Sequence, residues 1–349
     1  MANPPSPSIE PIASCVEQGT LYALAIDVRR GIAYFGGSER SVRSWRLNDE
    51  PVRSELAWHG RGAYVSSLVL AHDEPHGPVV ITGHYDGSLT WHEPATGRVL
   101  MSVESAHHGW VRDLALSGDG RRLVSVGNDM LVRCWDRATG TLQQTFAGHA
   151  AETPEGYVST LYSVAISPDG RCAASADRAG EVRVWDLERG SLVAQWRSAE
   201  FYTFDPEKRD RSMGGIRRVR FSPDGSTLAV AGIGQITNVD GFVGPARVEL
   251  WDWRAVKRRS LLGDSHNAVL NDVVFTANGQ HVVAGGGGDS GGVLLSWQLG
   301  KEKPVQKVKL KGHIHRLAWA TGDRLLTAGF EAVQLWSSAA VLATEESQA

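Results

Sequence analysis

The sequence predicts an all-β protein built from seven repeated, four-stranded antiparallel sheets. The first observation is the stretch 106–140, in which short apolar segments alternate with turn residues. Gly118-Asp119-Gly120 is typical of a turn, because glycine tolerates positive φ and aspartate accepts local backbone hydrogen bonds. Four short strands at hairpin spacing predict one small antiparallel sheet. They are Trp110–Leu116, Arg122–Val126, Leu131–Trp135 and Thr141–Phe146.

The second observation is that the same pattern recurs along the chain, mostly at intervals of about 40 to 50 residues. A repeat of that length with four strands is typical of a propeller blade. Such a sheet cannot cover both of its faces alone, so neighbouring repeats must pack on it. The ends of the third strands align at Trp45, His92, Trp135, Trp185, Trp251, Trp297 and Trp336.

These repeats carry short motifs that resemble the WD-repeat β-propeller family over about residues 12 to 345. The motifs are the dipeptides Trp135-Asp136, Trp185-Asp186, Trp251-Asp252, Gly148-His149 and Gly312-His313, and the turns Ser167-Pro168-Asp169-Gly170 and Ser222-Pro223-Asp224-Gly225. The resemblance implies one seven-bladed propeller over residues 12–345. Residues 1–11 are rich in Pro and Ser and are expected to be a disordered tail. Residues 346–349 are expected to be a C-terminal tail.

The family also implies that a terminal strand completes the last blade, whose other strands are predicted at Ile314–Ala320, Arg324–Thr327 and Ala332–Trp336. Closing the ring removes exposed sheet edges and makes the two chain ends stabilise each other. Two segments compete for this position. Ala13–Val16 and Ala340–Thr344 each have the composition of a short strand, and both alternatives remain open at this stage.

Composition narrows the class of protein. The net charge of −3 and the pI near 6.5 disfavour nucleic acid as a partner. The sequence has no apolar run long enough to span a membrane, and its first residues do not resemble a secretory signal. The three cysteines are widely spaced and odd in number, which favours a reducing compartment over a disulfide framework. We therefore expect a cytoplasmic protein.

Four irregular segments interrupt the repeats. They are links between blades or connections between second and third strands, and strand alternation places both types on the same face. We call this side the loop-rich face and the opposite side the short-turn face. The loop-rich face is expected to lie over blades three to six and to bind a protein or peptide partner. The four segments are Gly148–Gly156, Ser198–Gly215, Ile233–Pro245 and Gly285–Gly292.

The link between blades four and five combines aromatic and basic residues, the types enriched at binding hot spots. We expect it to touch the insertion in blade five, with Phe242 at the contact. An alternative is that the aromatic residues only anchor the long link to the ring and leave its charges solvated. The predicted partner-binding residues are Phe201, Tyr202, Phe204, Lys208, Arg209, Arg211 and Phe242.

Blade three holds the residues of a structural tetrad at the family's spacing. A buried indole N–H needs an acceptor, and a serine hydroxyl that accepts it can bond an imidazole held by aspartate. We interpret the set as support for a loop rather than as a catalytic triad. By the same alignment Glu39 takes the aspartate place in blade one, and Ala179 takes it in blade four. The predicted tetrad is His107, Ser125, Asp129 and Trp135.

No motif with catalytic context emerges. Gly288–Gly292 matches a serine nucleophile pattern, but a strand rather than a helix is predicted after it, so a flexible loop is expected. His313 and His315 are spaced for a metal, but they have no evident third ligand. We therefore expect a non-enzymatic scaffold with no cofactor, metal or catalytic residue. The alternative is a propeller-type hydrolase or lactonase with its site at the central channel.

Overall fold

The structure is a computed structural model. It describes residues 11–49, 52–60, 62–73, 77–205, 211–236, 244–288, 291–321 and 323–342.

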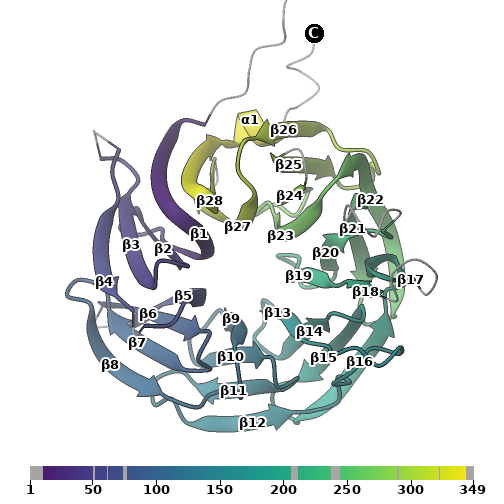
Figure 1. Cartoon of the computed structure of the whole chain (residues 1–349), viewed down its shortest axis with the longest axis horizontal. Coiled ribbons are helices and arrows are strands. Elements are labelled where there is room, and N and C mark those ends of the chain that lie inside the picture. Colours follow the sequence, from purple (N-terminus) through teal and green to yellow (C-terminus); the bar gives the residue numbers. More distant parts are fainter. Residues whose placement is uncertain are drawn as a thin grey trace, which may run out of the picture.

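Five four-stranded antiparallel sheets form most of a ring around a central axis (Figure 1). In each sheet consecutive strands pair with one another from the centre outward. The first sheet contains β5 (Val65–Asp73), β6 (Gly77–His84), β7 (Leu89–Glu93) and β8 (Arg98–Val103). The second contains β9 (Val111–Leu116), β10 (Arg122–Gly127), β11 (Val132–Asp136) and β12 (Leu142–Phe146). The third contains β13 (Leu161–Ile166), β14 (Cys172–Asp177), β15 (Glu181–Asp186) and β16 (Ser191–Arg197). The fourth contains β19 (Ile216–Phe221), β20 (Leu228–Ile233), β21 (Pro245–Asp252) and β22 (Lys257–Asn267). The fifth contains β23 (Val269–Phe275), β24 (His281–Gly288), β25 (Gly291–Gln298) and β26 (Gln306–Leu310).

A six-stranded sheet of order β27-β28-β1-β2-β3-β4 closes the ring. Within the described ranges there are thus six sheets of four or more strands, and the prediction of seven separate blades is wrong. The reason is strand continuity. Two long strands, β1 and β28, join the strands expected for the first and last blades into one hydrogen-bonded sheet. Its strands are β27 (Ile314–Thr321), β28 (Arg324–Ser337), β1 (Ala13–Asp27), β2 (Ile32–Gly37), β3 (Ser41–Arg46) and β4 (Glu55–His59).

The N-terminal segment, and not the C-terminal one, supplies the closing strand. Ala13 pairs with Leu335 and Val16 with Ala332, while the second half of β1 pairs with β2. The rival C-terminal segment begins in a short helix, α1 (Ser338–Leu342), and Val341 is buried beside Trp336. The pairing joins residues from opposite ends of the chain.

The innermost strands contact one another around the channel in the order β1, β5, β9, β13, β19, β23, β27 and back to β1 (Figure 1). The hydrophobic core lies between neighbouring sheets. For example, Val124 and Val132 of one sheet pack with Leu161 and Val164 of the next. Each such side chain, when fully buried, stabilises the fold by about 1.5–3 kcal/mol.

The glycine-rich segment Gly285–Gly292 differs from the predicted flexible loop. β24 continues to Gly288 and β25 begins at Gly291, and the two strands pair up to that point. A Cβ added at Gly286 would lie 1.8 Å from the carbonyl oxygen of Val269, and one at Gly292 would lie 1.9 Å from that of Gly312. The glycines therefore extend a hairpin between closely packed neighbouring strands.

The link between β16 and β19 contains its own small elements. A 3-10 turn at Ala199–Phe201 is followed by a two-stranded sheet of β17 (Tyr202–Asp205) and β18 (Arg211–Gly214). This hairpin lies at the side of the ring (Figure 1). Among the described residues, no helix has the length and apolar character needed to cross a bilayer.

Candidate interaction face

The four residues predicted as a tetrad in blade three lie together. The indole N–H of Trp135 donates to Ser125 Oγ at 2.8 Å, and His107 Nε2 lies 2.7 Å from the same oxygen. His107 Nδ1 lies 2.8 Å from Asp129 Oδ1. Burial lowers the pKa of His107, which favours the neutral ring. Burial raises the pKa of Asp129, but hydrogen bonds from His107 and Arg133 outweigh it and hold that pKa far below its usual range. The set fixes the β10–β11 turn on the loop-rich face.

A second tetrad, in blade four, was missed by the alignment. Trp185 Nε1 donates to Ser175 Oγ at 2.8 Å, and His149 bridges Ser175 and Asp177, with 2.8 Å at each nitrogen. The expectation that Ala179 takes the aspartate place is wrong, because the carboxylate comes from Asp177, the last residue of β14. The Gly148-His149 motif was the available signal for this set.

The aromatic residues of the predicted binding link mostly face inward. Phe201 has no exposed surface and packs with Ile216 and Val230. The Tyr202 hydroxyl donates to Glu155, which ties this link to the preceding one. Phe204 is partly exposed. Phe201 and Tyr202 therefore anchor the link to the ring, as the alternative interpretation predicts.

The basic part of that link is only partly described. Arg211 begins β18, opposite Asp205. Lys208, Arg209 and Phe242 lie outside the described residues.

The expected contact between the two insertions is present. The backbone N–H of Ile236 donates to Thr203 Oγ1 at 2.9 Å. Arg247 Nε lies 3.3 Å from Glu200 Oε1. The hydrogen bond joins the link to the blade-five insertion, and the ion pair joins the link to β21 just after that insertion.

Sequence reasoning missed a group of aromatic and arginine side chains around the channel on the loop-rich face. We call it the mouth arc. The rings of Tyr85 and Trp110 stack with centroids 4.0 Å apart, and Tyr22 lies 6.1 Å from Tyr85. The Arg112 guanidinium lies 4.3 Å from the centre of the Trp110 ring. The members of the arc are Tyr22, Tyr64, Tyr85, Trp110, Arg112, Tyr162, Arg217 and His315.

A simple signal in the sequence identifies half of the arc. Arg112, Tyr162, Arg217 and His315 are each the second residue of an inner strand. Because side chains alternate along a strand, the same position in each inner strand of a ring points into the channel at the same height. The repeat pattern therefore predicts these four positions as one group at the channel.

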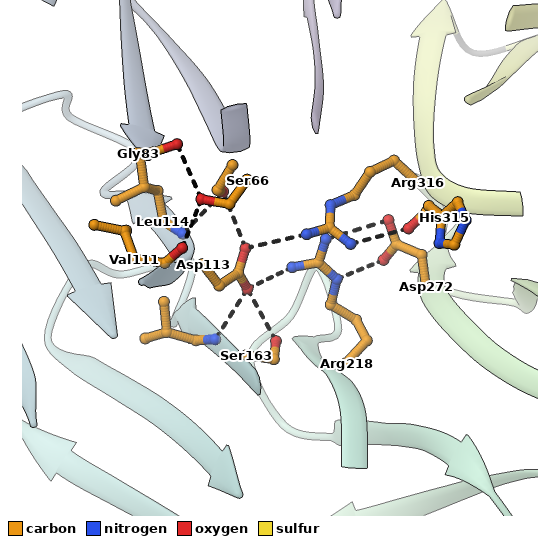
Figure 2. Close-up of polar contacts among 12 residues, drawn as sticks. Ser66, Gly83, Val111, Asp113, Leu114, Ser163, Arg218, Asp272, His315 and Arg316 are labelled. Atoms are coloured by element: carbon orange, nitrogen blue, oxygen red, sulfur yellow. Dashed lines mark hydrogen bonds and ion pairs between the residues drawn. The ribbon is translucent and has the colours of Figure 1, made fainter. Parts of the chain in front are cut away.

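Figure 2 shows a layer of buried charges across the channel. Its residues Asp113, Arg218 and Arg316 directly follow the arc residues Arg112, Arg217 and His315 in their strands. Arg218 Nε lies 2.7 Å from Asp272 Oδ1, and another nitrogen of the same guanidinium pairs with Asp113. Arg316 lies 3.9 Å from Asp113 and donates to the carbonyl oxygen of His315 at 2.9 Å. Asp113 also accepts a bond from the hydroxyl of Ser163 at 3.1 Å. The layer ties five inner strands together, β9, β13, β19, β23 and β27.

These channel carboxylates do not resemble a metal or hydrolase centre, because arginine already pairs with both. In the part of the chain that the structure describes, the one cluster with metal-ligand geometry is His149, Asp177 and Glu181. Two of these belong to the blade-four tetrad, and Glu181 lies 2.6 Å from Arg183 Nε. Neither site leaves a free set of ligands for a catalytic ion.

The ring of radially packed antiparallel sheets defines a β-propeller. Residues 98–136 and 140–186 match the family described as "WD domain, G-beta repeat". With the tryptophan-centred hydrogen-bond sets described above, these matches support a WD-repeat β-propeller family for the chain.

Several known proteins are similar to parts of the chain. It is 31% identical over 156 residues to autophagy-related protein 16 of Arabidopsis thaliana, covering 45% of this chain and 28% of that protein. It is 30% identical over 124 residues to eukaryotic translation initiation factor 3 subunit I of Aspergillus terreus, covering 36% of this chain and 30% of that protein. It is 29% identical over 196 residues to small ribosomal subunit protein RACK1y of Oryza sativa, covering 54% of this chain and 52% of that protein. The chain thus spans between about a quarter and half of these relatives.

Proposed function

We propose that this protein is a non-enzymatic scaffold that binds a protein partner on its loop-rich face. The single observation that carries the proposal is the mouth arc. Aromatic rings and arginines line the channel opening on the face that also holds the long links. Trp110 remains 37% exposed even though Tyr85 stacks on it. Exposed aromatic and arginine side chains around a hollow are typical of protein-binding hot spots.

The similar proteins support a role within a larger assembly. Two of them are named as a subunit of a translation initiation factor and as a ribosomal subunit protein. The described cysteines are all free, which agrees with a reducing compartment. We propose a cytoplasmic location and a protein or peptide partner rather than nucleic acid.

The predicted basic residues of the link between β16 and β19 enter the proposal as a second contact region. We propose that Lys208, Arg209 and Arg211 present positive charge to an acidic segment of the partner at the rim of the ring. Rim charges act mainly on the association rate and lose their effect in salt. The anchored aromatic residues Phe201 and Tyr202 then hold this link in place.

Affinity capture from native cells with quantitative mass spectrometry tests the proposal. Bait with Lys208, Arg209 and Arg211 all changed to Ala should recover less of the partner, most clearly at low salt, while its stability stays within about 0.5 kcal/mol of the parent. The matched control changes Arg121, Arg171 and Arg189 to Ala, away from the arc. Full recovery with both the triple change and a bait lacking residues 236–244 would eliminate this region as the binding site.

A further inference from the structure

The chemistry of the mouth arc indicates what kind of group it recognises. Arg112 donates to the side-chain oxygen of Asn128 at 2.6 Å and packs on Trp110. Arg217 packs on Tyr162 at 4.3 Å from the ring centre. Among the described residues, neither arginine forms an ion pair with a carboxylate. Both cations are therefore held in position by neutral partners, with their charge uncompensated.

The tyrosine between these two arginines reports the local potential. Burial raises the pKa of Tyr162, but Arg217, Arg112 and Arg178 outweigh burial and lower it. A tyrosine pKa that is lowered in spite of burial indicates positive potential around the phenol. The arc therefore favours negative charge.

The charged layer beneath adds to this excess. Three arginines, Arg218, Arg220 and Arg316, share the two carboxylates of Asp113 and Asp272. Arg316 is the most poorly compensated, because its nearest carboxylate oxygen is 3.9 Å away. Burial and the neighbouring Arg218 lower the pKa of Arg316 to about 10. An anion that reached Arg316 from the mouth would relieve this repulsion.

The space for such a group is present. A hollow of about 210 Å³ is lined by Tyr22, Tyr85, Arg112, Tyr162, Arg217, His315 and Arg316. A second hollow of about 540 Å³ shares Arg217, Asn271 and His315 with the first and is also lined by Gly287 and His313. Because these residues line both, the two hollows are adjacent, near the start of β27.

We propose that the mouth arc binds an anionic side chain of an extended peptide segment, a carboxylate or a phosphate, whose backbone continues along the second hollow. This inference rests on the proposed function and specifies the chemical class of the partner's contact group. The aromatic rings supply apolar contact, while Arg112, Arg217 and Arg316 supply charge. A peptide fits better than nucleic acid, because the chain carries a net charge of −3 and the basic residues gather at one opening rather than along a groove.

Fluorescence anisotropy with synthetic probes tests the inference on the full chain. One fluorescein-labelled peptide carries three consecutive glutamates between Gly-Ser repeats, a second replaces them with glutamines, and a third carries one phosphoserine. An oligothymidylate of equal charge is the fourth probe. The glutamate or phosphoserine peptide should bind, more weakly as salt increases, and the glutamine peptide should bind at least about tenfold more weakly. The stronger of the two anionic probes identifies the group.

The variant Arg112→Gln/Arg217→Gln should lose about tenfold or more in affinity for the anionic probe. The matched control Arg121→Gln/Arg171→Gln, which removes equal charge from exposed turns on the short-turn face, should keep it. The inference is overturned by equal binding of the glutamine peptide, by tighter binding of the oligothymidylate, by a double variant that binds like the parent, or by no anionic peptide binding below about 1 mM.

The probes separate failure of this inference from failure of the proposed function. If native capture still recovers a partner through the loop-rich face while every anionic peptide fails, the proposed function stands and the anionic recognition is wrong. If the anionic peptide binds at the arc but capture recovers no partner on this face, the scaffold proposal fails instead.

Discussion

Asp113 and Arg218 form a buried ion pair between β9 and β19, two inner strands that are not neighbours in the ring. The strand between them, β13, contributes Ser163, whose hydroxyl donates to Asp113 and accepts the backbone N–H of Val219. Arg218 continues the network to Asp272. The guanidinium of Arg218 thus joins β9 and β23, and each of its two partners lies more than fifty residues away in the sequence.

This relationship predicts a large effect from one substitution. Arg218→Met should lower the free energy of unfolding by about 3–5 kcal/mol, because it leaves two buried carboxylates without their main partner. Urea denaturation at pH 7 measures it. Changing Asp113 and Asp272 to Leu in the same chain should recover part of the loss. A loss below about 0.5 kcal/mol for Arg218→Met would contradict the account of the layer.

The channel histidine predicts a pH dependence. Burial, Arg316 and His313 lower the pKa of His315 to about 4. Because its folded pKa lies below its unfolded value near 6.5, the unfolded chain binds the extra proton first. The resulting stability is fully present above pH 6.5 and is lost as the pH falls through about 4. His315→Asn should flatten this part of the stability profile. A histidine NMR titration that places His315 near 6.5 would refute the prediction.

Ring closure predicts a contrast between two truncations. Deleting residues 1–18 removes the strand that pairs with Ala332–Leu335 and should cost several kcal/mol, since a long sheet edge and Cys15 in the core are lost. Deleting residues 1–10 should be nearly neutral. Thermal unfolding of both chains measures the difference. Equal melting temperatures for the longer deletion and the parent would show that β1 does not hold the ring closed.

The two tetrads predict similar losses of folding stability when their histidines are removed. His107→Ala and His149→Ala should each destabilise the protein by roughly 1–3 kcal/mol, because a buried hydrogen-bond network loses its central member. Ser290→Ala is the control and should change neither stability nor function. Chemical denaturation of the three variants makes the comparison. Serine-hydrolase probe labelling that disappears in Ser290→Ala would overturn the non-enzymatic interpretation.

The repeat period was sufficient to predict most strands. Trp135 and Trp185 lie one residue before the ends of third strands, close to the predicted ends, because an aromatic residue at this place recurs with the period of the fold. The number of separate sheets could not be obtained this way. Whether β1 and β28 bend within one sheet or divide into two depends on backbone continuity at residues such as Glu331, which has a positive φ of 57°. Apolar periodicity does not report that continuity.

The site was less predictable than the fold for a geometric reason. Tyr85 and Trp110 stack across two different sheets, and Asp113 reaches past β13 to Arg218, so these contacts depend on the channel radius. Asp177 was missed because the tetrad carboxylate lies two positions before the aligned one. Long irregular links were visible in the sequence, but whether Phe201 faced solvent or the core depended on the neighbouring sheet.

The most direct test of the central claim is a hydrogen–deuterium exchange footprint on the complex recovered by native capture. The account predicts slower amide exchange in bound protein over residues 107–112, 149–160, 199–205 and 211–217, which lie on the loop-rich face, with no change in the turns at 117–121, 167–171 and 222–226. Protection confined to those short turns, with the mouth arc exchanging as in free protein, would contradict it.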